Sequence, residues 1–388
     1  MELKPINLHR RQTKKNFFKR YKLILFIAAI VIALTLIWSL FSSSSSVFQF
    51  VFPLGSKLKS TSDRVNILLL GNAGGSHAGA SLTDSIIIAS YQLKTNKVTL
   101  ISIPRDLWIE GAKAKVNTVY ENGGLKYAED KIDDILGLPI HYGVRMDFNG
   151  FAKAIDLVDG IDIDVPKTFD DYNYPIEGKE DDLCGLLEKE VELTEDQIKA
   201  FNLQPGGITL KPGKSKVLVD SQDKIATQAA DFSCRFEHIS FVKGKTHMDG
   251  TTALKFVRSR MGTNGEGSDF ARSRRQQLVL QAFRNKVLSF ETLINPQKIT
   301  GLVDTFGKSF ETDIELDRFL ELYSLMKKIK QVNNLVLGDL GSGKSIFSSP
   351  SSSNYGGAYV LIPPDGDFKP VKDFIKSELD KQAADDSK

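Results

Sequence analysis

The sequence from residue 64 to residue 103 reads RVNILLLGNAGGSHAGASLTDSIIIASYQLKTNKVTLISI. It contains three short apolar segments of strand-like composition, at residues 65–70, 85–91 and 98–103. Lys94, Thr95 and Asn96 separate the second segment from the third and predict a tight hairpin turn. A meander of three neighbouring strands is therefore expected where the globular part begins.

Helical periodicity follows this region, and strands and helices that interleave predict a layered α/β domain. Residues 167–246 differ from their surroundings because they are acidic and are interrupted by Gly and Pro, and we interpret them as an insertion. The tail from residue 376 is polar and is expected to be frayed. The predicted helices cover residues 124–136, 149–158, 248–258, 270–290 and 317–330, and a late strand is expected at 359–362.

The N-terminus has the features of a membrane anchor. Residues 1–22 contain eight Lys and Arg but one Glu, a net charge of +7. Residues 23–41 read LILFIAAIVIALTLIWSLF, an uncharged apolar run that nearly matches the thickness of a bilayer core. Because positive charge precedes the run, we expect a cytoplasmic N-terminus and an extracytoplasmic body. A cleaved signal peptide is the alternative, although no small-residue cleavage site follows Phe41 directly.

The body of the chain is mildly acidic. The whole sequence has a net charge of +3, so the +7 of residues 1–22 leaves −4 for the remainder. This charge argues against nucleic acid as the main partner, since such proteins carry a basic footprint. The chain has two cysteines, Cys184 and Cys234, and an oxidising compartment outside the cell favours a disulfide between them.

The predicted meander brings three charged residues to one edge of the sheet. Asp84 begins the second strand, and Arg105 and Asp106 follow the third, beside the glycine-rich loop after the first. Ligands commonly bind at such strand ends. Two carboxylates near an arginine suit Mg²⁺, with Mn²⁺ as an alternative, because hard cations share oxygen ligands with phosphate. Taken singly, each aspartate is more typical of a turn or cap residue, and the two together at one edge make the site hypothesis.

A second group of candidates lies on the predicted helix 270–290. Offsets of three and four residues place Arg272 and Arg275 on the same stripe as Val279, which should face the interior. Arg274 points elsewhere. Buried guanidinium groups need partners, and their planar fork matches phosphate oxygens. We favour an anion site, and the alternative is a structural salt-bridge network with the acidic insertion.

Residues 338–345, GDLGSGKS, match the pattern of a nucleotide-binding P-loop. A P-loop must open a helix whose N-terminus helps to hold the phosphates. The continuation IFSSPSSSNYGG disfavours a helix, so no nucleotide is expected as a ligand.

Several spaced motifs in order resemble the LytR–CpsA–Psr family over about residues 64–290. They are NILLLG (66–71), TDS (83–85), SIPRD (102–106), KVN (115–117), GFAKAIDLVDGIDIDVP (150–166), MDGTTALKFVRSR (248–260) and SDFARSRRQQLVL (268–280). The resemblance implies an α/β/α sandwich with a central mixed sheet, preceded by one transmembrane helix. The chain departs from the family's usual G-x-D pattern after the first strand, where it has Gly71-Asn72-Ala73.

The resemblance also implies roles for particular residues. It makes Asp84 and Asp106 the metal-associated carboxylates, which together with Arg105, Arg272 and Arg275 form the catalytic group. The implied diphosphate-binding residues are Arg105, Arg258, Arg260, Arg272, Arg275 and Gln276, and the supporting residues are Lys115, Asn117 and Asp269.

The function implied by the resemblance is that of a membrane-anchored, Mg²⁺-dependent phosphotransferase. It would move a glycopolymer from a polyprenyl-diphosphate carrier to peptidoglycan outside the cell. Two alternatives stay open: a hydrolase of polyprenyl diphosphates, and a non-catalytic protein that binds lipid-linked glycans. The expected organisation is a basic tail (1–22), a membrane span (23–41), a linker (42–63), the catalytic domain (64–290) with its insertion (167–246), a C-terminal extension (291–375) and a flexible tail (376–388).

Overall fold

The computed structural model describes residues 58–75, 79–202, 212–226, 231–289, 292, 309–340 and 345–384. The chain divides into two compact units, of which one comprises Met1–Leu58 and Glu315–Leu322. In that unit, the backbone N–H of Leu58 donates to Glu321 Oε2 at 3.2 Å. The other unit, Lys59–Ile314 and Tyr323–Lys388, contains the sheet and the cavity. Helix α10 (Leu316–Lys328) crosses the boundary between the two.

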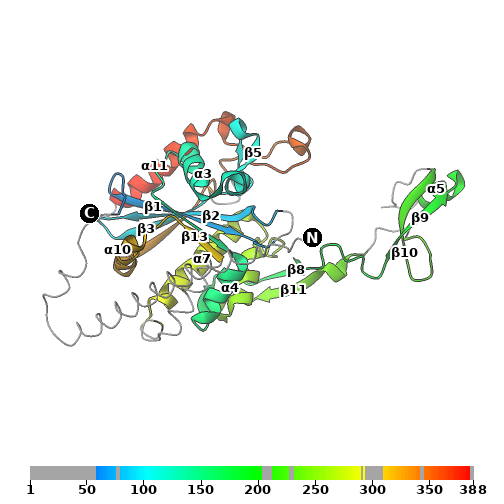
Figure 1. Ribbon diagram of the computed structural model, residues 1–388, viewed down its shortest axis with the longest axis horizontal. Helices are drawn as coiled ribbons and strands as arrows, with labels where there is room; N and C mark the ends of the chain where they lie inside the picture. The colour runs from blue at the N-terminus through cyan, green and yellow to red at the C-terminus, as the bar shows by residue number, and fades with distance from the viewer. Residues whose placement is uncertain are drawn as a thin grey trace, which may run out of the picture. The chain divides into compact units, whose positions relative to one another are not determined.

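Six strands form the central sheet, in the order β13-β6-β1-β2-β3-β14 (Figure 1). Strands β1, β2 and β3 are the predicted antiparallel meander. β6 runs parallel to β1, β14 runs parallel to β3, and β13 is antiparallel to β6, so the sheet is mixed as predicted. The bounds are β1 Arg64–Asn72, β2 Thr83–Gln92, β3 Lys97–Ser102, β6 Tyr142–Asp147, β13 Phe310–Thr312 and β14 Gln331–Val336.

The predicted turn between β2 and β3 is confirmed. Asn96 has a φ of 57°, in the left-handed region that asparagine tolerates better than most residues. Its backbone N–H donates to the carbonyl oxygen of Gln92 at 3.0 Å, which closes the turn. The turn fixes the register in which β3 returns beside β2, and therefore where the end of β3 lies.

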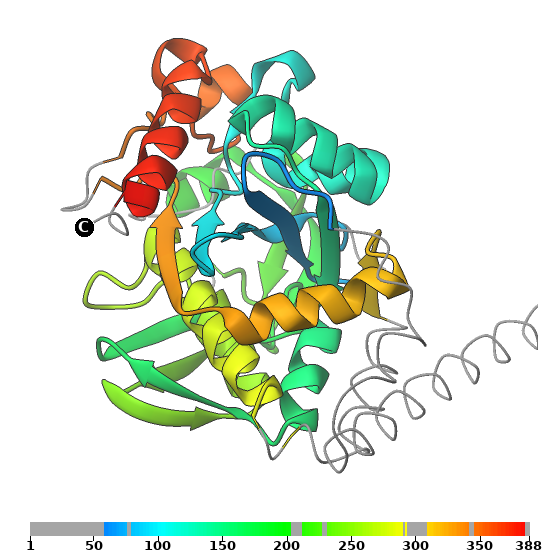
Figure 2. The same ribbon diagram turned by 90° about the vertical axis from the view of Figure 1, so that its left-hand side faces the viewer.

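Two helices cover one face of the sheet, as Figures 1 and 2 show for α3 (Val119–Leu136) and α11 (Lys369–Ala384). Leu68 and Ile88 are fully buried on this face and belong to the same core cluster as residues of both helices. The predicted helix at 124–136 is confirmed and begins earlier, at Val119.

The prediction of a frayed tail from residue 376 was wrong, because α11 continues to Ala384. Val371, Ile375 and Leu379 recur every four residues and are at most 5% exposed. This spacing forms a narrow apolar stripe on an otherwise polar helix. With β13 and β14, the helix shows that residues after 290 complete the domain.

The opposite face of the sheet is covered by α7 (Asp269–Val287), which packs on β3 and β14. The buried Gln277 of α7 donates through Nε2 to Ser102 Oγ at 2.8 Å and to Leu335 O at 3.2 Å. Helices α6 (Gly250–Arg258) and α4 (Phe148–Leu157) pack on each other beside it. The helices predicted here from periodicity are confirmed, so helices flank the mixed sheet on both faces (Figure 2).

The acidic segment 167–246 is only partly an addition to the core. Phe169 and Tyr174 of β8 and Phe241 of β11 are buried in one cluster with Phe256 of α6. A disulfide joins Cys184 to Cys234 and confirms the predicted pairing. A separate small cluster holds β9, α5 and β10 together. The strands and helix in and beside this segment are β7 Ile161–Val165, β8 Phe169–Pro175, β9 Leu187–Leu193, α5 Glu195–Asn202, β10 Gly213–Val219, β11 Phe236–Phe241 and β12 Gly244–Met248.

The late strand predicted at 359–362 was also wrong. Leu361 and Ile362 form only isolated bridges, with Leu107 and Ser348 respectively. In the P-loop-like segment, Asp339 bridges Ser345, and the described residues that follow are not helical up to Ser351.

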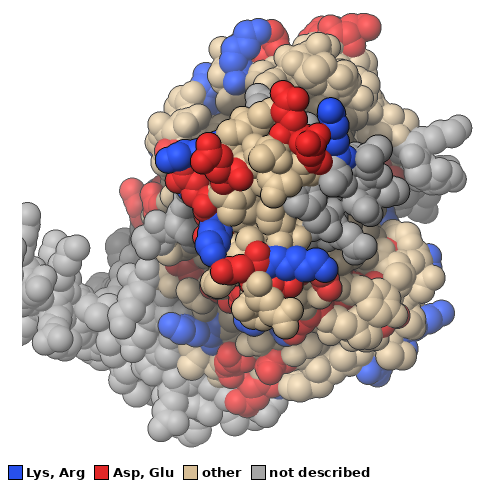
Figure 3. Space-filling model, turned by 90° about the vertical axis from the view of Figure 1, so that its right-hand side faces the viewer, with Lys and Arg blue, Asp and Glu red and all other residues tan. Residues whose placement is uncertain are grey.

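Across the described ranges, no helix is both long and apolar enough to cross a bilayer. The predicted span at 23–41 lies outside those ranges. Figure 3 shows one face of the molecule, where acidic and basic side chains lie interspersed among uncharged ones. On the described part of this face, no continuous basic patch is visible.

Candidate functional site

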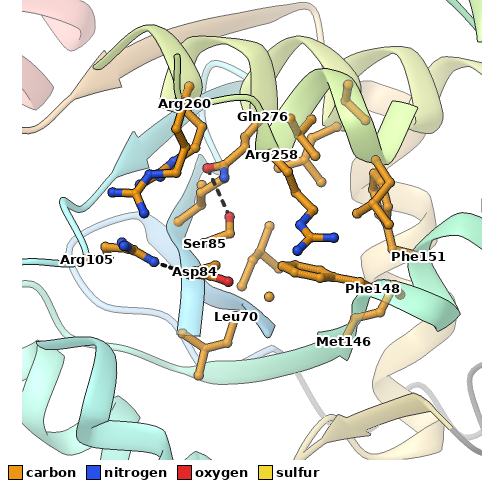
Figure 4. Close-up of a pocket in the computed structure, with 18 of the residues that line it drawn as sticks. Leu70, Asp84, Ser85, Arg105, Met146, Phe148, Phe151, Arg258, Arg260 and Gln276 are labelled. Carbon is orange, nitrogen blue, oxygen red and sulfur yellow. Dashed lines mark hydrogen bonds and ion pairs between the residues drawn. The ribbon is translucent and has the colours of Figure 1, made fainter. Parts of the chain in front are cut away.

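A cavity of about 340 Å³ lies between the sheet face that carries Leu69 and Ile87 and helices α6 and α7 (Figure 4). Six charged side chains reach its wall: four arginines and two aspartates. Most of the remaining wall is apolar. The charged residues are Asp84, Arg105, Asp171, Arg258, Arg260 and Arg272, and the apolar ones include Leu69, Ile87, Val144, Met146, Phe148, Phe151, Leu254, Val257, Val279 and Leu280.

The structure brings Asp84 and Arg105 together at the strand edge, as the meander predicts. Arg105 Nη1 is ion-paired with Asp84 Oδ1, and both residues line the cavity (Figure 4). Burial lowers the pKa of Arg105, but the neighbouring carboxylates of Asp84 and Asp106 outweigh burial and hold it above its usual value. Arg105 therefore stays charged beside the cavity.

Asp106 lies behind this pair and does not line the cavity. Its side chain is 4% exposed, and its two oxygens are paired with Lys115 Nζ at 2.6 Å and with Arg105 Nε at 3.4 Å. Lys115, predicted as a supporting residue, thus acts on the site through Asp106. The Asp106 carboxylate thus lies between the cations of Lys115 and Arg105.

Asn117 connects the strand ends that carry Asp84 and Arg105. Its backbone N–H donates to Arg105 O at 3.2 Å, and its carbonyl accepts from Thr83 Oγ1 at 3.1 Å. These bonds hold the end of β3 and the start of β2 at a fixed separation. The contacts of Asn117 with these strand ends are made by its backbone, and its role in the site stays a prediction.

Arg272 begins the arginine group on α7. The helix starts at the N-cap Ser268, whose Oγ accepts from Ala271 N at 3.1 Å. Arg272 Nη2 lies 2.9 Å from Asp269 Oδ1, and Arg260 lies 3.8 Å from the same oxygen. One carboxylate is therefore shared by two guanidinium groups.

The electrostatic environment of Arg272 is unfavourable for its own charge. Its side chain is only 8% exposed. Burial, followed by repulsion from Arg105 and Arg260, lowers the pKa of Arg272 to about 10 despite the attraction of Asp269. Buried positive charges without enough counter-charge favour the binding of an anion.

Arg258 occupies another part of the cavity. Its guanidinium carbon lies 4.8 Å from the centre of the Phe148 ring, a cation–π contact. Gln276 lies between the two groups of arginines, where its Oε1 accepts from Ser85 Oγ at 3.2 Å (Figure 4). The cavity thus has a polar end near Arg105 and Arg260 and a more apolar part near Phe148.

The structure places Arg275 outside the cavity, which corrects its predicted role as a diphosphate ligand. Arg275 is 1% exposed and directs four of its five N–H groups at protein atoms. Nε donates to Phe256 O at 2.7 Å, Nη2 to Ser259 O at 2.6 Å, and Nη1 to the backbone and side chain of Glu266, both at 2.8 Å. The helical spacing predicted correctly that Arg275 is buried, but its guanidinium group is bonded to protein atoms and not free to bind a ligand in the cavity.

Asp171 was missed by the sequence reasoning and completes this arrangement. It is 1% exposed, and its Oδ2 accepts from Ser259 Oγ at 2.7 Å, Met261 N at 3.1 Å and Arg260 N at 3.2 Å. Asp171 and Arg275 therefore hold the turn after α6 from opposite sides, through its donors and its carbonyls. That turn carries Arg260 and directly follows Arg258, the last residue of α6.

Ser85, Phe148 and Tyr174 also line the cavity without having been predicted. Ser85 could have been found, since it directly follows Asp84 on the same strand. Asp171 and Tyr174 carry no such signal, because the position of β8 depends on its antiparallel pairing with β11, which is distant in the sequence.

A mixed, helix-flanked sheet and an arginine-lined cavity define a layered α/β domain that is suited to bind an anion. Residues 44–351 match the LytR_cpsA_psr family, and the chain belongs to this family. The solved structure of a Streptococcus agalactiae protein is similar in fold, with a TM-score of 0.52 at 19% identity over 82% of this chain and 88% of the other.

Two curated relatives match in sequence. The polyisoprenyl-teichoic acid–peptidoglycan teichoic acid transferase TagV of Bacillus subtilis (strain 168) is 23% identical over 306 residues, which cover 77% of this chain and 60% of TagV. The regulatory protein MsrR of Staphylococcus aureus (strain Mu50) is 26% identical over 243 residues, 62% of this chain and 54% of MsrR. The chain thus spans less than two thirds of the length of these relatives.

Proposed function

We propose that the protein is a membrane-anchored phosphotransferase that acts outside the cell. It moves a glycopolymer from a polyprenyl-diphosphate carrier to peptidoglycan. The observation that carries this proposal is the under-neutralised group of Arg105, Arg260 and Arg272 at one end of an otherwise apolar cavity. The name of TagV, a teichoic acid–peptidoglycan transferase, supports the choice of polymer and acceptor.

The charge of the cavity supports a diphosphate. Four arginines and two aspartates line the wall, which leaves two positive charges in excess, and Asp269 reduces the excess to one. A diphosphate diester carries two negative charges and offers several acceptor oxygens to guanidinium forks. Arg105, Arg260 and Arg272 hold one phosphate, and Arg258 with Gln276 reaches the other.

The apolar wall supports the lipid part of the substrate. Leu69 and Ile87 on the sheet face Val257, Val279 and Leu280 on the helices. Burying a polyprenyl chain between these side chains is favourable by about 25 cal/mol for each Å² of apolar surface. The lipid chain thus orients the diphosphate relative to the arginines.

The reaction itself is one phosphoryl transfer. An acceptor hydroxyl oxygen attacks the phosphorus next to the glycan, a new P–O bond forms, and the bond to the bridging oxygen breaks. Polyprenyl phosphate leaves with that oxygen, and Asp84 takes the hydroxyl proton because its carboxylate lines the cavity. Asp106 is less suited as the base, since both of its oxygens are already paired. The arginines stabilise the charge that develops.

A divalent cation fits one of its two predicted ligands. Asp84 lines the cavity, and one of its oxygens is not needed for the ion pair with Arg105. Mg²⁺ is often held by one carboxylate together with substrate phosphates. Asp106 does not fit, because Lys115 and Arg105 occupy its oxygens. Bound at Asp84, Mg²⁺ would further neutralise the phosphate oxygens.

Residues 1–22 and 23–41 complete the proposal. The basic tail and the apolar run after it favour a single span with a cytoplasmic N-terminus. This topology leaves the catalytic domain on the side where peptidoglycan lies.

The test is product analysis with the full-length protein in lipid vesicles, supplied with a polyprenyl-diphosphate glycan and peptidoglycan fragments. We expect polyprenyl phosphate to be released in equal amount to the glycan that becomes covalently attached to the acceptor. Free phosphorylated glycan would indicate a hydrolase instead. Binding without any release of polyprenyl phosphate would indicate a non-catalytic protein.

A further inference from the structure

Three aromatic side chains that the proposed reaction does not use lie beside the segment that carries Arg105 and Asp106. Trp108 and Tyr355 form an edge-to-face pair, with ring centroids 5.0 Å apart and planes at 79°. Tyr359 is 53% exposed, which is unusual for a large aromatic residue. These side chains come from two backbone segments that are hydrogen-bonded to each other at Trp108 and Leu361, and we call Trp108, Tyr355 and Tyr359 together the aromatic surface.

The aromatic surface is connected to the site by short steps. Trp108 of β4 (Trp108–Ile109) is paired with Lys115 of β5 (Ala114–Lys115), and cross-strand partners share one face of a ribbon. Lys115 Nζ contacts Asp106 Oδ1 at 2.6 Å, and Asp106 contacts Arg105 on the cavity wall.

A second connection comes from the C-terminal part of the chain. Leu361 N donates to Asp106 O at 2.9 Å, and Trp108 N donates to Leu361 O at 2.8 Å. Tyr359 precedes Leu361 by two residues. Figures 1 and 2 show the segment after β14 beside β5. The backbone that carries the aromatic surface is therefore hydrogen-bonded to the backbone that carries Asp106.

The groups around the aromatic surface are polar and include one ion pair without net charge, Glu110 with Lys113. Ser351 to Asn354 and Gly356 to Gly357 are exposed and flank Tyr355 with hydroxyl, amide and backbone groups. Glu110, the carboxylate next to Trp108, accepts from Trp108 Nε1 at 2.8 Å and is ion-paired with Lys113. Its charge is thus neutralised locally, so the aromatic surface offers little to a polyanion.

Aromatic faces bordered by Ser, Asn and Gly form adaptable contact surfaces, because the rings are rigid and the small polar residues supply hydrogen bonds. The apolar C–H face of a pyranose ring packs on such a ring, while its hydroxyl and acetamido groups bond the polar rim. A neutral sugar chain matches both halves of this chemistry.

We propose that the aromatic surface is an acceptor subsite, which binds an uncharged chain of N-acetylated pyranose sugars. The subsite presents an acceptor hydroxyl to the phosphorus held at Arg105. This inference rests on the proposed function, since it names the binding place for the acceptor of that reaction.

The test uses the full-length protein in vesicles and an N-acetylglucosamine hexamer as the probe, without any lipid donor. Saturation-transfer NMR should show the hexamer bound, and Tyr355→Ala and Tyr359→Ala should each weaken binding roughly three- to tenfold. Tyr172→Ala is the matched control, because Tyr172 is 61% exposed on β8 and belongs to neither the cavity wall nor the aromatic surface. It should bind the hexamer as the wild type does.

The affinity for a polyprenyl diphosphate separates this proposal from the proposed function. Both tyrosine variants should retain wild-type affinity for the diphosphate and show a raised KM for the acceptor with little change in kcat. Wild-type hexamer binding by both variants, or equal weakening in Tyr172→Ala, overturns the subsite. Failure of the wild type to bind the diphosphate would overturn the proposed function while the hexamer result still decides the subsite.

Discussion

The guanidinium group of Arg272 lies in the cavity wall, and the carboxylate paired with it is shared with a second arginine. Arg272 shares Asp269 with Arg260, and its pKa is lowered to about 10, first by burial and then by Arg105 and Arg260. Under the proposed function, a bound phosphate would supply the missing negative charge, and the stabilisation would be greatest as charge develops on the transferred phosphate.

Arg272→Ala is expected to lower kcat about 100-fold or more, because it removes a cation aimed at the developing charge. Turnover of the lipid-linked glycan measures the effect. Arg274→Ala is the matched control from the same helix, since Arg274 is 49% exposed and paired with Asp339 outside the cavity wall. Equal loss in the two variants would contradict the assigned role of Arg272.

Asp171→Ala should reduce activity through position rather than chemistry. The carboxylate orders the turn at Ser259, Arg260 and Met261. Its removal leaves these three donors and the backbone N–H of Asn173 unpaired and costs about 1–3 kcal/mol in stability. We expect a higher KM for the lipid donor and a lower melting temperature. Asp164→Ala, at an exposed position of β7, should change neither quantity, and a wild-type KM in Asp171→Ala would refute the positioning role.

At the scale of single residues, the sequence separated buried arginines from exposed ones. It did not separate arginines that line the cavity from arginines that hold other parts of the protein in place. The spacing on α7 placed Arg272 and Arg275 on the inward stripe, and both are buried. Helical periodicity predicts which face of a helix is buried. It does not predict whether that face borders a cavity or packs against other protein groups. Arg275 meets carbonyl groups of α6 and the following turn, whose position depends on the tertiary fold.

Strand β6 begins directly after a buried histidine, His141. The Nδ1 atom of His141 accepts from Asn66 N at 2.9 Å, and Nε2 lies 3.0 Å from Thr61 Oγ1. Burial lowers the pKa of His141 below its usual 6.5, so the native state favours the neutral ring. The folded state then binds fewer protons than the unfolded state below about pH 6.5, and stability is lost as the pH falls through that region.

Melting temperatures measured from about pH 8 to pH 5 test this prediction. The decline at acid pH should be smaller in His141→Gln than in the wild type. His247→Ala should behave as the wild type, because His247 is exposed beside Asp162. An identical pH profile in His141→Gln would show that another group controls the decline.

Helix α11 should contribute to stability without contributing to chemistry. Ile375 is 2% exposed in the core cluster that includes Leu68 and Ile88 of the sheet, so Ile375→Ala should cost about 2–5 kcal/mol in the free energy of unfolding. Denaturant titration measures this cost. Lys376→Ala, at an exposed position of the same helix, should cost less than about 0.5 kcal/mol. Equal effects would show that α11 does not pack as described.

The elements that the sequence predicted well have strong local signals. The meander has three apolar runs with a turn between two of them, and α7 has a long periodic pattern. Helix α11 was missed because its buried stripe consists of only three apolar residues, one per turn, in a polar segment. The strand expected at 359–362 has strand-like composition, but it meets only single backbone partners at Leu107 and Ser348.

The site as a whole exists only in the complete fold. Its wall combines β2 with α6 and α7, which are separated by more than 150 residues in the sequence, and the ribbon β8–β11 contributes Asp171. Local patterns predicted the sheet edge with Asp84 and Arg105, while the family resemblance was needed for Arg258 and Arg260. No local pattern predicts the apolar part of the wall, because its side chains come from β1, β2, β6, α4, α6 and α7 and meet only in the folded protein.

The most direct test of the central claim is a binding measurement on the full-length protein in detergent or vesicles. Calorimetric titration with a polyprenyl diphosphate should show one molecule bound per chain, with affinity reduced at least about tenfold in both Arg258→Ala and Arg272→Ala and unchanged in Arg274→Ala. Wild-type affinity in the first two variants would mean that the diphosphate does not occupy this cavity, and the account of the site would fail.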